Sequence, residues 1–333
     1  MSSGAVKQLY CVLTEKCNLN CNFCIRGNKP NVVMDYEQFV KYVLPEKLHW
    51  QTIILTGGEP LLHKRFYDIL KVAAENFSNV VVASNGTIPI DIHKLKSFDL
   101  RNVIFQISVD GSKKAHEIIR GEGTYEKSFD TIRMFENIGI NYCVSTVVNR
   151  NNSESLIELI IELARLKNLK YWKVSSMMPH GIASLNDCMT SDEWNAFITE
   201  ILEYCPFKVV TQKLYDFDLY ENVLSRQDFI PAVRNCGSGK NKVYVYPNLE
   251  IYPCTCLKDF SLGNLKLLTI EDAIKFYDSS YDIKNESICT TCKFLKICNG
   301  GCPGMSNKIF QKFGYGDIRC PKVDQYYREN FKV

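Results

Sequence analysis

The sequence predicts an α/β fold: a partial, TIM-like (β/α)6 barrel followed by a small cysteine-rich domain. Apolar, β-branched runs alternate with helical stretches through most of the chain. Repetition of strand and helix favours parallel pairing through right-handed crossovers, and six such units suit a partial barrel. Eight of the 15 cysteines follow residue 235, which sets the C-terminal part apart. The length of 333 residues and the 46% hydrophobic content suit about two domains.

Six segments have the composition of buried strands. They are Gln8–Thr14, Gln51–Thr56, Asn79–Ser84, Asn102–Val109, Asn141–Val148 and Tyr171–Met177. Helices are expected to begin near Asp35, Lys64, Asp91, Glu126, Ser153 and Ser191. We therefore predict a barrel over residues 1–205, a connecting region over 206–235 and the cysteine-rich domain over 236–333.

Charge and hydropathy exclude several classes of protein. The chain has 40 basic and 37 acidic residues spread along its length, so we expect no nucleic-acid partner. The sequence shows neither a signal peptide nor a long apolar span, so we expect no membrane partner. Disulfide-dense folds are mostly small secreted domains, unlike this chain of 333 residues. We therefore expect a cytoplasmic protein with reduced thiols.

A cysteine cluster directly follows the first predicted strand. Cys17, Cys21 and Cys24 have the spacing C-x3-C-x2-C, and the asparagines between them suit a tightly curled loop. Three thiolates can bind three irons of a [4Fe-4S] cluster, which normally takes four cysteines, so one iron is left without a protein ligand. Zinc is the competing interpretation, because C-x2-C pairs are common zinc ligands.

A glycine-containing turn follows the second predicted strand. Gly57 and Gly58 allow a close backbone approach to a ligand, and the Glu59 carboxylate can accept hydrogen bonds from an ammonium group. An ordinary turn with a helix-capping Glu59 is the competing interpretation. Sites in such barrels lie at the C-terminal ends of the strands, so this turn and Cys17 are expected to lie close together.

Together these motifs resemble the signature of the radical S-adenosylmethionine (SAM) superfamily, including its Gly-Gly-Glu-Pro motif. The resemblance implies that the open iron chelates the amino and carboxylate groups of SAM. It also implies that one-electron reduction cleaves SAM to methionine and a 5′-deoxyadenosyl radical. Gly57, Gly58 and Glu59 would then bind the methionine moiety.

Other predicted strand ends resemble further parts of the same family. Asn85, Ser108 and Asp110 resemble residues that contact the ribose and carboxylate of SAM, although Asn-Gly and Asp-Gly are also ordinary turn sequences. Arg120 either pairs with the SAM carboxylate or is a solvated charge. The segment around His180 would line the adenosyl and substrate side of the barrel, but a lone histidine in a turn is usually exposed.

The C-terminal cysteines resemble the SPASM extension of radical SAM enzymes, which carries two auxiliary [4Fe-4S] clusters. The resemblance assigns Cys236, Cys254 and Cys302 to the first auxiliary cluster. It assigns the second cluster to Cys289, Cys292, Cys298 and Cys320. Cys256 is a candidate fourth ligand of the first cluster, and an open or substrate-filled position is the alternative.

One position departs from the SPASM pattern. The glycine that the family usually places in a hairpin, five residues before Cys254, is Leu249 here. Asparagine tolerates left-handed backbone angles, so we expect Asn248 to form the turn instead.

These motifs predict a radical SAM enzyme with three [4Fe-4S] clusters, one binding SAM and two auxiliary. SPASM proteins mostly modify peptides, so a ribosomally made precursor peptide is the expected substrate, with crosslinking, thioether formation, epimerisation or oxidation all open. The alternatives are a small carbohydrate or aminoglycoside substrate and, in a different class, a non-catalytic zinc-binding scaffold. A flavodoxin or ferredoxin would donate the electron. The first strand starts almost at the N-terminus, so we expect a separate leader-peptide-binding protein.

Overall fold

The computed structural model describes residues 7–27, 30–225, 237–275, 284 and 286–331. One ten-stranded sheet has the order β10-β9-β8-β1-β2-β3-β4-β5-β6-β7. Its strands, in chain order, are β1 Gln8–Thr14, β2 Thr52–Gly57, β3 Asn79–Ser84, β4 Val103–Ser108, β5 Tyr142–Val148, β6 Leu169–Ser176, β7 Val209–Val210, β8 Lys242–Val245, β9 Glu250–Tyr252 and β10 Gly263–Asn264. Neighbouring strands from β1 to β7 are all parallel.

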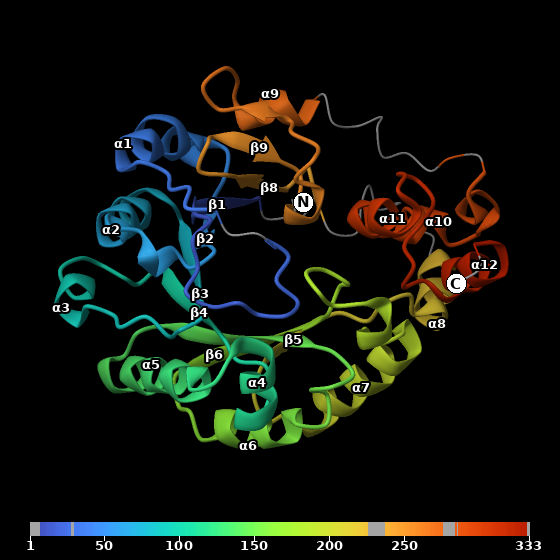
Figure 1. Cartoon of the computed structure of the whole chain (residues 1–333), viewed down its shortest axis with the longest axis horizontal. Coiled ribbons are helices and arrows are strands. Elements are labelled where there is room, and N and C mark those ends of the chain that lie inside the picture. Colours follow the sequence, from blue (N-terminus) through green and yellow to red (C-terminus); the bar gives the residue numbers. More distant parts are fainter. Residues whose placement is uncertain (1–6, 28–29, 226–236, 276–283, 285, 332–333) are drawn as a thin grey trace.

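Helices cover the outer side of the curved sheet, whereas the loop after β1 lies inside the curve (Figure 1). The helices of the barrel part are α1 Tyr36–Gln38, α2 Phe66–Asn76, α3 Ile92–Leu95, α4 Lys113–Arg120, α5 Thr124–Ile138, α6 Leu156–Ala164 and α7 Ser191–Tyr204. Parallel strands covered in this way read as nearly continuous apolar runs, as in β2. The α/β class and the partial barrel are therefore confirmed.

The predicted strands agree with the observed ones to within two residues at each end, and the predicted helix starts to within three. Helix α4 was not predicted. It is only eight residues long and is enclosed between the end of β4 and helix α5.

Helix α7 shows how the sequence defines an element boundary. Thr190 Oγ1 accepts a hydrogen bond from the Glu193 amide at 3.2 Å, and the Glu193 carboxylate accepts one from the Thr190 amide at 2.7 Å. This reciprocal capping box satisfies donors that the first turn would otherwise leave unpaired. Trp194, on the buried face, is 1% exposed and anchors the helix to the core.

The cysteine-rich part joins the barrel through the sheet. Strand β8 pairs in parallel with β1, and β9 and β10 follow it in antiparallel order. Helices α8 Phe217–Leu224, α9 Ile270–Lys275, α10 Leu295–Cys298, α11 Pro303–Phe310 and α12 Pro321–Asn330 complete the described chain. A small second core contains three cysteines, Cys289, Cys298 and Cys320, packed with Tyr215 and Val323. The proposed domain boundaries at 205 and 235 stay predictions.

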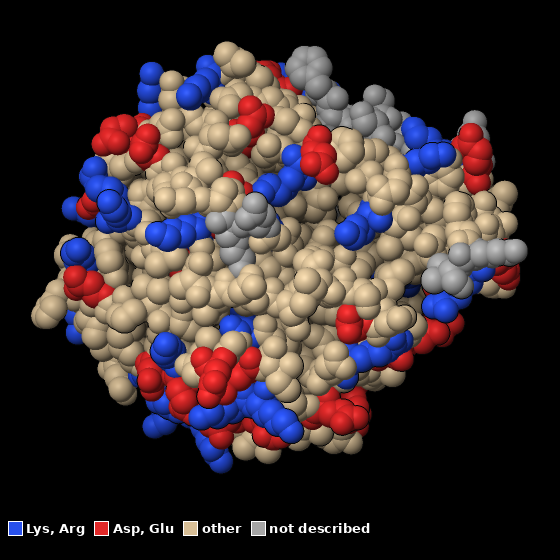
Figure 2. All heavy atoms as spheres, in the orientation of Figure 1, with Lys and Arg blue, Asp and Glu red and all other residues tan. Residues whose placement is uncertain are grey.

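Charged residues of both signs are interspersed around the rim of the face in Figure 2, and the centre of that face is largely uncharged. This distribution agrees with the small net charge of +3. Among the described helices, none combines the length and the apolar character needed to cross a bilayer.

The hairpin between β8 and β9 differs from its prediction. Leu249, and not Asn248, adopts the left-handed conformation, with φ of 67°. The Asn248 side chain instead accepts a hydrogen bond from the Glu250 amide at 3.2 Å. Leu249 is fully buried in the main core. Burial of its side chain therefore outweighs a left-handed penalty of about 1–2 kcal/mol.

This balance predicts an order of stability for two variants. Leu249→Gly should lower the free energy of unfolding by about 2 kcal/mol, because the lost side-chain burial exceeds the relieved backbone strain. Leu249→Ala should lower it further, since alanine loses the same contacts and keeps the strain. Urea unfolding of both variants and the wild type measures the order. A Leu249→Gly variant less stable than Leu249→Ala would contradict this account.

Candidate active site

A cavity of about 360 Å³ lies at the C-terminal ends of the barrel strands. It is lined by residues from the loop after β1 and from the ends of β2, β3, β4 and β6. The predicted site residues that line it are Cys17, Cys21, Cys24, Gly57, Gly58, Asn85, Ser108, Arg120 and His180. A volume in this range is typical of small-molecule and cofactor sites.

The three-cysteine loop is anchored at several backbone positions. The Asn22 amide donates to Ile119 O at 3.3 Å, and Ile182 donates to Asn22 O at 3.0 Å. The Asn18 carbonyl oxygen, Oδ1, accepts from Asn85 Nδ2 at 3.0 Å, which connects the loop to the end of β3. Gly181 has φ of 63°, and a Cβ there would lie 2.7 Å from Asn22 O, so this close approach requires glycine.

Gly57 and Gly58 are required by contacts within the protein. A Cβ at Gly57 would lie 2.7 Å from Thr14 O, and one at Gly58 would overlap the backbone of Lys16. The Gly58 amide donates to Thr14 O at 2.7 Å, and the Glu59 amide donates to Lys16 O at 2.9 Å. These hydrogen bonds hold the turn after β2 against the chain just before Cys17. The sequence predicted that this turn and Cys17 lie close together.

Glu59 lies behind the cavity wall and is fully buried. Its carboxylate accepts hydrogen bonds from Ser84 Oγ at 2.9 Å, the Asn85 amide at 2.8 Å and the Leu61 amide at 3.2 Å. It therefore orients the end of β3, where Asn85 faces the cavity. Burial raises the pKa of Glu59 to about 7, although these hydrogen bonds act to lower it. A contact between Glu59 and an ammonium group stays a prediction.

Asp110 is also buried, and it holds Arg120. Arg120 Nε donates to Asp110 Oδ2 at 2.6 Å, and the Val147 amide donates to Asp110 Oδ1 at 2.8 Å. The Arg120 side chain is only 10% exposed, so it is not a solvated surface charge. Its Nη1 lies 4.0 Å from Cys21 Sγ. Burial raises the pKa of the Cys21 thiol, and the positive charge of Arg120 opposes that rise.

Two buried polar atoms at the end of β6 have no hydrogen-bond partner in the described structure. They are Ser176 Oγ and His180 Nε2, and both residues line the cavity. Burial, and to a smaller extent Lys308, lowers the pKa of His180 to about 4, so its ring is neutral near pH 7. His180 is thus not the exposed histidine that its turn suggested. Ser176 was missed, although a polar residue ending a barrel strand could have indicated it.

Unpartnered buried polar atoms are rare in folded proteins, so these two atoms are available to hydrogen-bond a bound ligand or water. The cavity that they line also contains three thiols and a guanidinium group beside them. These residues fit a cluster with bound SAM, because they offer soft sulfur ligands and polar contacts in one enclosed volume. Among the described residues, no three His, Cys, Asp or Glu side chains form a group that could hold a single metal ion. A cubane cluster instead binds each thiolate to a different iron.

The C-terminal cysteines fall into two groups in space. Four of them line a small cavity of about 20 Å³ beside Phe294, namely Cys289, Cys292, Cys298 and Cys320. In the other group, a Cβ at Gly304 would lie 3.6 Å from the sulfurs of both Cys256 and Cys302. The Cys256 amide lies 3.4 Å from Cys254 Sγ. Cys236 lies outside the described residues. None of the cysteines that the structure describes forms a disulfide.

Glu59 offers a test of this buried wall. A carboxyl group whose folded-state pKa is raised stabilises the fold most below its unfolded pKa and loses that contribution as pH rises through 7. Relative to Glu59→Gln, the wild type should therefore lose up to about 3 kcal/mol of unfolding free energy between pH 4.5 and pH 8. Urea unfolding of both SAM-free proteins at pH 5 and pH 8 measures this change. An equal difference at both pH values would contradict it.

Known proteins resemble this chain most clearly in its barrel part. Residues 11–164 match the Radical SAM superfamily. The sporulation killing factor maturation protein SkfB of Bacillus subtilis is 33% identical over 156 residues, which cover 46% of this chain and 38% of SkfB. The AdoMet-dependent heme synthase of Methanosarcina barkeri is 23% identical over 314 residues, covering 86% of this chain and 88% of the synthase.

The fold resembles that of Streptococcus suis SuiB. The crystal structure of SuiB bound to S-adenosylmethionine has a TM-score of 0.78 and 16% identity, covering 95% of this chain and 77% of SuiB. SuiB bound to its precursor peptide SuiA has a TM-score of 0.77, covering 96% and 76% of the respective chains. Both likenesses extend beyond the barrel into the C-terminal cysteine-rich part.

Proposed function

We propose that this chain, whose residues 11–164 match the Radical SAM superfamily, is a radical SAM enzyme that modifies a ribosomally synthesised precursor peptide. The observation that carries this proposal is the cavity at the barrel mouth, which gathers three cysteines, a buried guanidinium group and two unpartnered polar atoms. SkfB is named as a maturation protein, and SuiB was solved with a precursor peptide. Both support a peptide substrate.

Each group around the cavity has a proposed task. Cys17, Cys21 and Cys24 hold a [4Fe-4S] cluster, and the backbone of Gly57 and Gly58 lies beside the methionine part of SAM. When bound, reduced cluster and SAM supply a 5′-deoxyadenosyl radical for hydrogen abstraction. Arg120, with its fixed ion pair, presents a cation to the SAM carboxylate.

The remaining polar groups complete the binding surface. Asn85 and Ser108 face the cavity from neighbouring strand ends, where they reach the ribose and carboxylate of SAM. Ser176 Oγ and the neutral ring of His180 provide hydrogen bonds to adenosine or substrate. Glu59 and Asp110 act behind this surface by holding Asn85 and Arg120 in place.

The C-terminal cysteine groups are proposed to hold two auxiliary [4Fe-4S] clusters. Cys289, Cys292, Cys298 and Cys320 already share one cavity. Cys254, Cys256 and Cys302 form the other group, near Gly304, and Cys236 is proposed as a further ligand. These clusters accept an electron from the substrate radical or hold the substrate. A flavodoxin or ferredoxin supplies the reducing electron.

A second candidate function within the same chemistry is the modification of a small molecule. The heme synthase aligns over 86% of this chain, more than the 46% that SkfB covers. Mass spectrometry distinguishes the two functions. Co-expression with small peptides encoded beside the gene should give a mass change in one of them, and the change should disappear with Cys21→Ala. Unmodified peptides throughout would favour the small-molecule substrate.

SAM cleavage tests the assignment of the first cluster. Anaerobic reconstitution with iron and sulfide, followed by SAM and dithionite, should yield 5′-deoxyadenosine. Cys21→Ala should reduce the product to background, because a cluster with two cysteine ligands is not retained. Cys292→Ala should spare SAM cleavage more than peptide modification. Cys205→Ala, outside the proposed ligand sets, is the matched control. SAM cleavage by Cys21→Ala would overturn the site assignment.

Cys256 can be tested as the fourth ligand of the first auxiliary cluster. Cys256→Ser should lower the iron content by up to one cluster per chain or change the electron paramagnetic resonance spectrum of one auxiliary cluster, since serine is a poorer iron ligand. Cys205→Ser serves as the control for loss of a thiol. Iron content and spectra equal to those of the wild type would remove Cys256 from the ligand set.

A further inference from the structure

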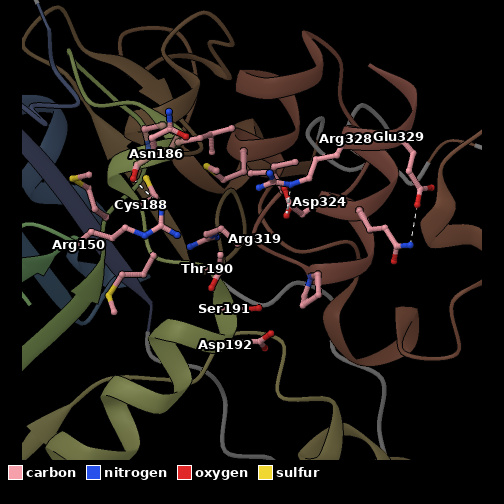
Figure 3. Close-up of a pocket in the computed structure, with 18 residues that line it drawn as sticks. Arg150, Asn186, Cys188, Thr190, Ser191, Asp192, Arg319, Asp324, Arg328 and Glu329 are labelled. Carbon is pink, nitrogen blue, oxygen red and sulfur yellow. Dashed lines mark hydrogen bonds and ion pairs between the residues drawn. The ribbon is translucent and has the colours of Figure 1, made fainter. Parts of the chain in front are cut away.

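A second cavity, of about 500 Å³, lies between the β6–α7 connection and helix α12 (Figure 3). We call it the interface cavity. Met177 lines both this cavity and the one at the barrel mouth, so the end of β6 forms their shared wall. Part of its lining is apolar, with Leu185, Met189, Met305 and Ile318. A ligand that reaches both cavities would therefore pass along the end of β6.

The N-terminus of α7 opens into the interface cavity. Thr190, Ser191 and Asp192 line it, and the amide groups of a helix's first turn attract negative charge. Ser191 is 2% exposed, and its Oγ has no hydrogen-bond partner in the described structure. The capping box uses Thr190 and Glu193 and leaves the Ser191 hydroxyl aside. A buried hydroxyl of this kind is available to donate a hydrogen bond to an acceptor on a ligand.

Two guanidinium groups point toward each other above this first turn (Figure 3). Arg150 Nη2 donates to Glu193 at 2.7 Å, and its Nη1 donates to Asn186 O at 2.9 Å. Arg319 donates from Nε and Nη2 to the two oxygens of Asp317, so its Nη1 edge faces away from that carboxylate. Both side chains are held in place by these contacts.

Both guanidinium groups affect the pKa of the Cys188 thiol, which lines the same cavity. Burial raises the pKa of Cys188 to about 11, and Asp187 adds to the rise, whereas Arg319 and Arg150 both act to lower it. Both positive charges therefore act on the same part of the cavity, around Cys188.

Two of the acidic residues that line the interface cavity lie on helix α12, away from the N-terminus of α7. Asp324 accepts from Arg328 Nε at 2.9 Å, and Glu329 accepts from Gln325 at 2.9 Å, so both are already engaged on the α12 side. Asp192 is exposed, and solvent screens its charge. Glu193 and Asp317 pair with the two guanidinium groups. The region around Ser191, Arg150 and Arg319 is thus the part of the cavity that offers a hydroxyl and guanidinium N–H donors to an anion.

We propose that the interface cavity binds a carboxylate of the peptide substrate, between Ser191 and the guanidinium groups of Arg150 and Arg319. The carboxylate belongs to an acidic side chain or to the peptide's C-terminus, and this inference rests on the proposed peptide substrate. The apolar lining then contacts the adjoining residues of the peptide. Anchoring one carboxylate here selects which residue, beyond Met177, enters the barrel cavity.

Calorimetric titration of the anaerobically purified holoprotein tests this site with three probes. They are a blocked Gly-Glu-Gly peptide, its blocked Gly-Gln-Gly counterpart, and a Gly-Gly-Gly peptide with only its C-terminal carboxylate free. One of the two carboxylate probes should bind at least roughly tenfold more tightly than the glutamine peptide, because charge-assisted hydrogen bonds are lost with the amide. Which carboxylate probe binds identifies the source of the carboxylate.

Variants locate the binding. Arg150→Gln and Ser191→Ala should each weaken the carboxylate probe by about threefold to tenfold, and neither should change the glutamine probe. Arg165→Gln, whose guanidinium pairs with Glu162 away from the cavity, controls for lost charge, and Ser97→Ala controls for a lost hydroxyl. Thermal unfolding verifies that each variant is folded. Equal binding of all three probes, no binding, or binding unchanged in both variants would overturn the proposal.

The titration uses neither SAM nor reductant. A protein that discriminates the probes but forms no 5′-deoxyadenosine would support the carboxylate-binding site and contradict the proposed function. A protein that forms 5′-deoxyadenosine but does not discriminate the probes would contradict the carboxylate-binding site and leave the proposed function standing.

Discussion

The contact between the turn after β2 and the chain just before Cys17 is the constraint on which the rest of the site depends. The amide of Gly58 donates a hydrogen bond to Thr14 O, and the amide of Glu59 donates one to Lys16 O. At Gly57 and Gly58 no side chain larger than hydrogen fits. Because β1 and β2 are parallel neighbours, this contact joins two strand ends into one rigid support. The cysteine loop is therefore positioned by the sheet.

The surface of the barrel cavity is backed by a second layer of buried charges. Glu59 holds Asn85, and Asp110 holds Arg120, so the groups that face the cavity are oriented by groups that do not. Burying a carboxylate is costly unless hydrogen bonds or an opposite charge compensate for it. In both cases most of the compensating partners also line the cavity, namely Ser84, Asn85, Arg120 and Val147, which couples the stability of the fold to the geometry of the site.

The β6–α7 connection links chemistry with recognition in the proposed scheme. It contributes Met177 and His180 to the barrel cavity, and Met177, Cys188 and Thr190 to the interface cavity. Connecting segments carried by a rigid scaffold commonly determine specificity, because they vary without disturbing the core. Helix α12, which belongs to the cysteine-rich part, closes the opposite side of the interface cavity. A peptide bound as proposed would contact both parts of the chain.

The sequence by itself determined where the barrel strands lie along the chain and how the cysteines are spaced, because these are local patterns of hydrophobicity and residue type. It also indicated that Gly57 and Cys17 lie together, since parallel strands end at one edge. Only the tertiary structure decided on which side of the cavity wall each side chain lies. It buried Glu59 and Asp110 behind that wall, left Ser176 facing the cavity unpaired, and made Leu249 left-handed despite its neighbour Asn248. These outcomes depend on packing between residues far apart in the chain, which can outweigh local backbone preference.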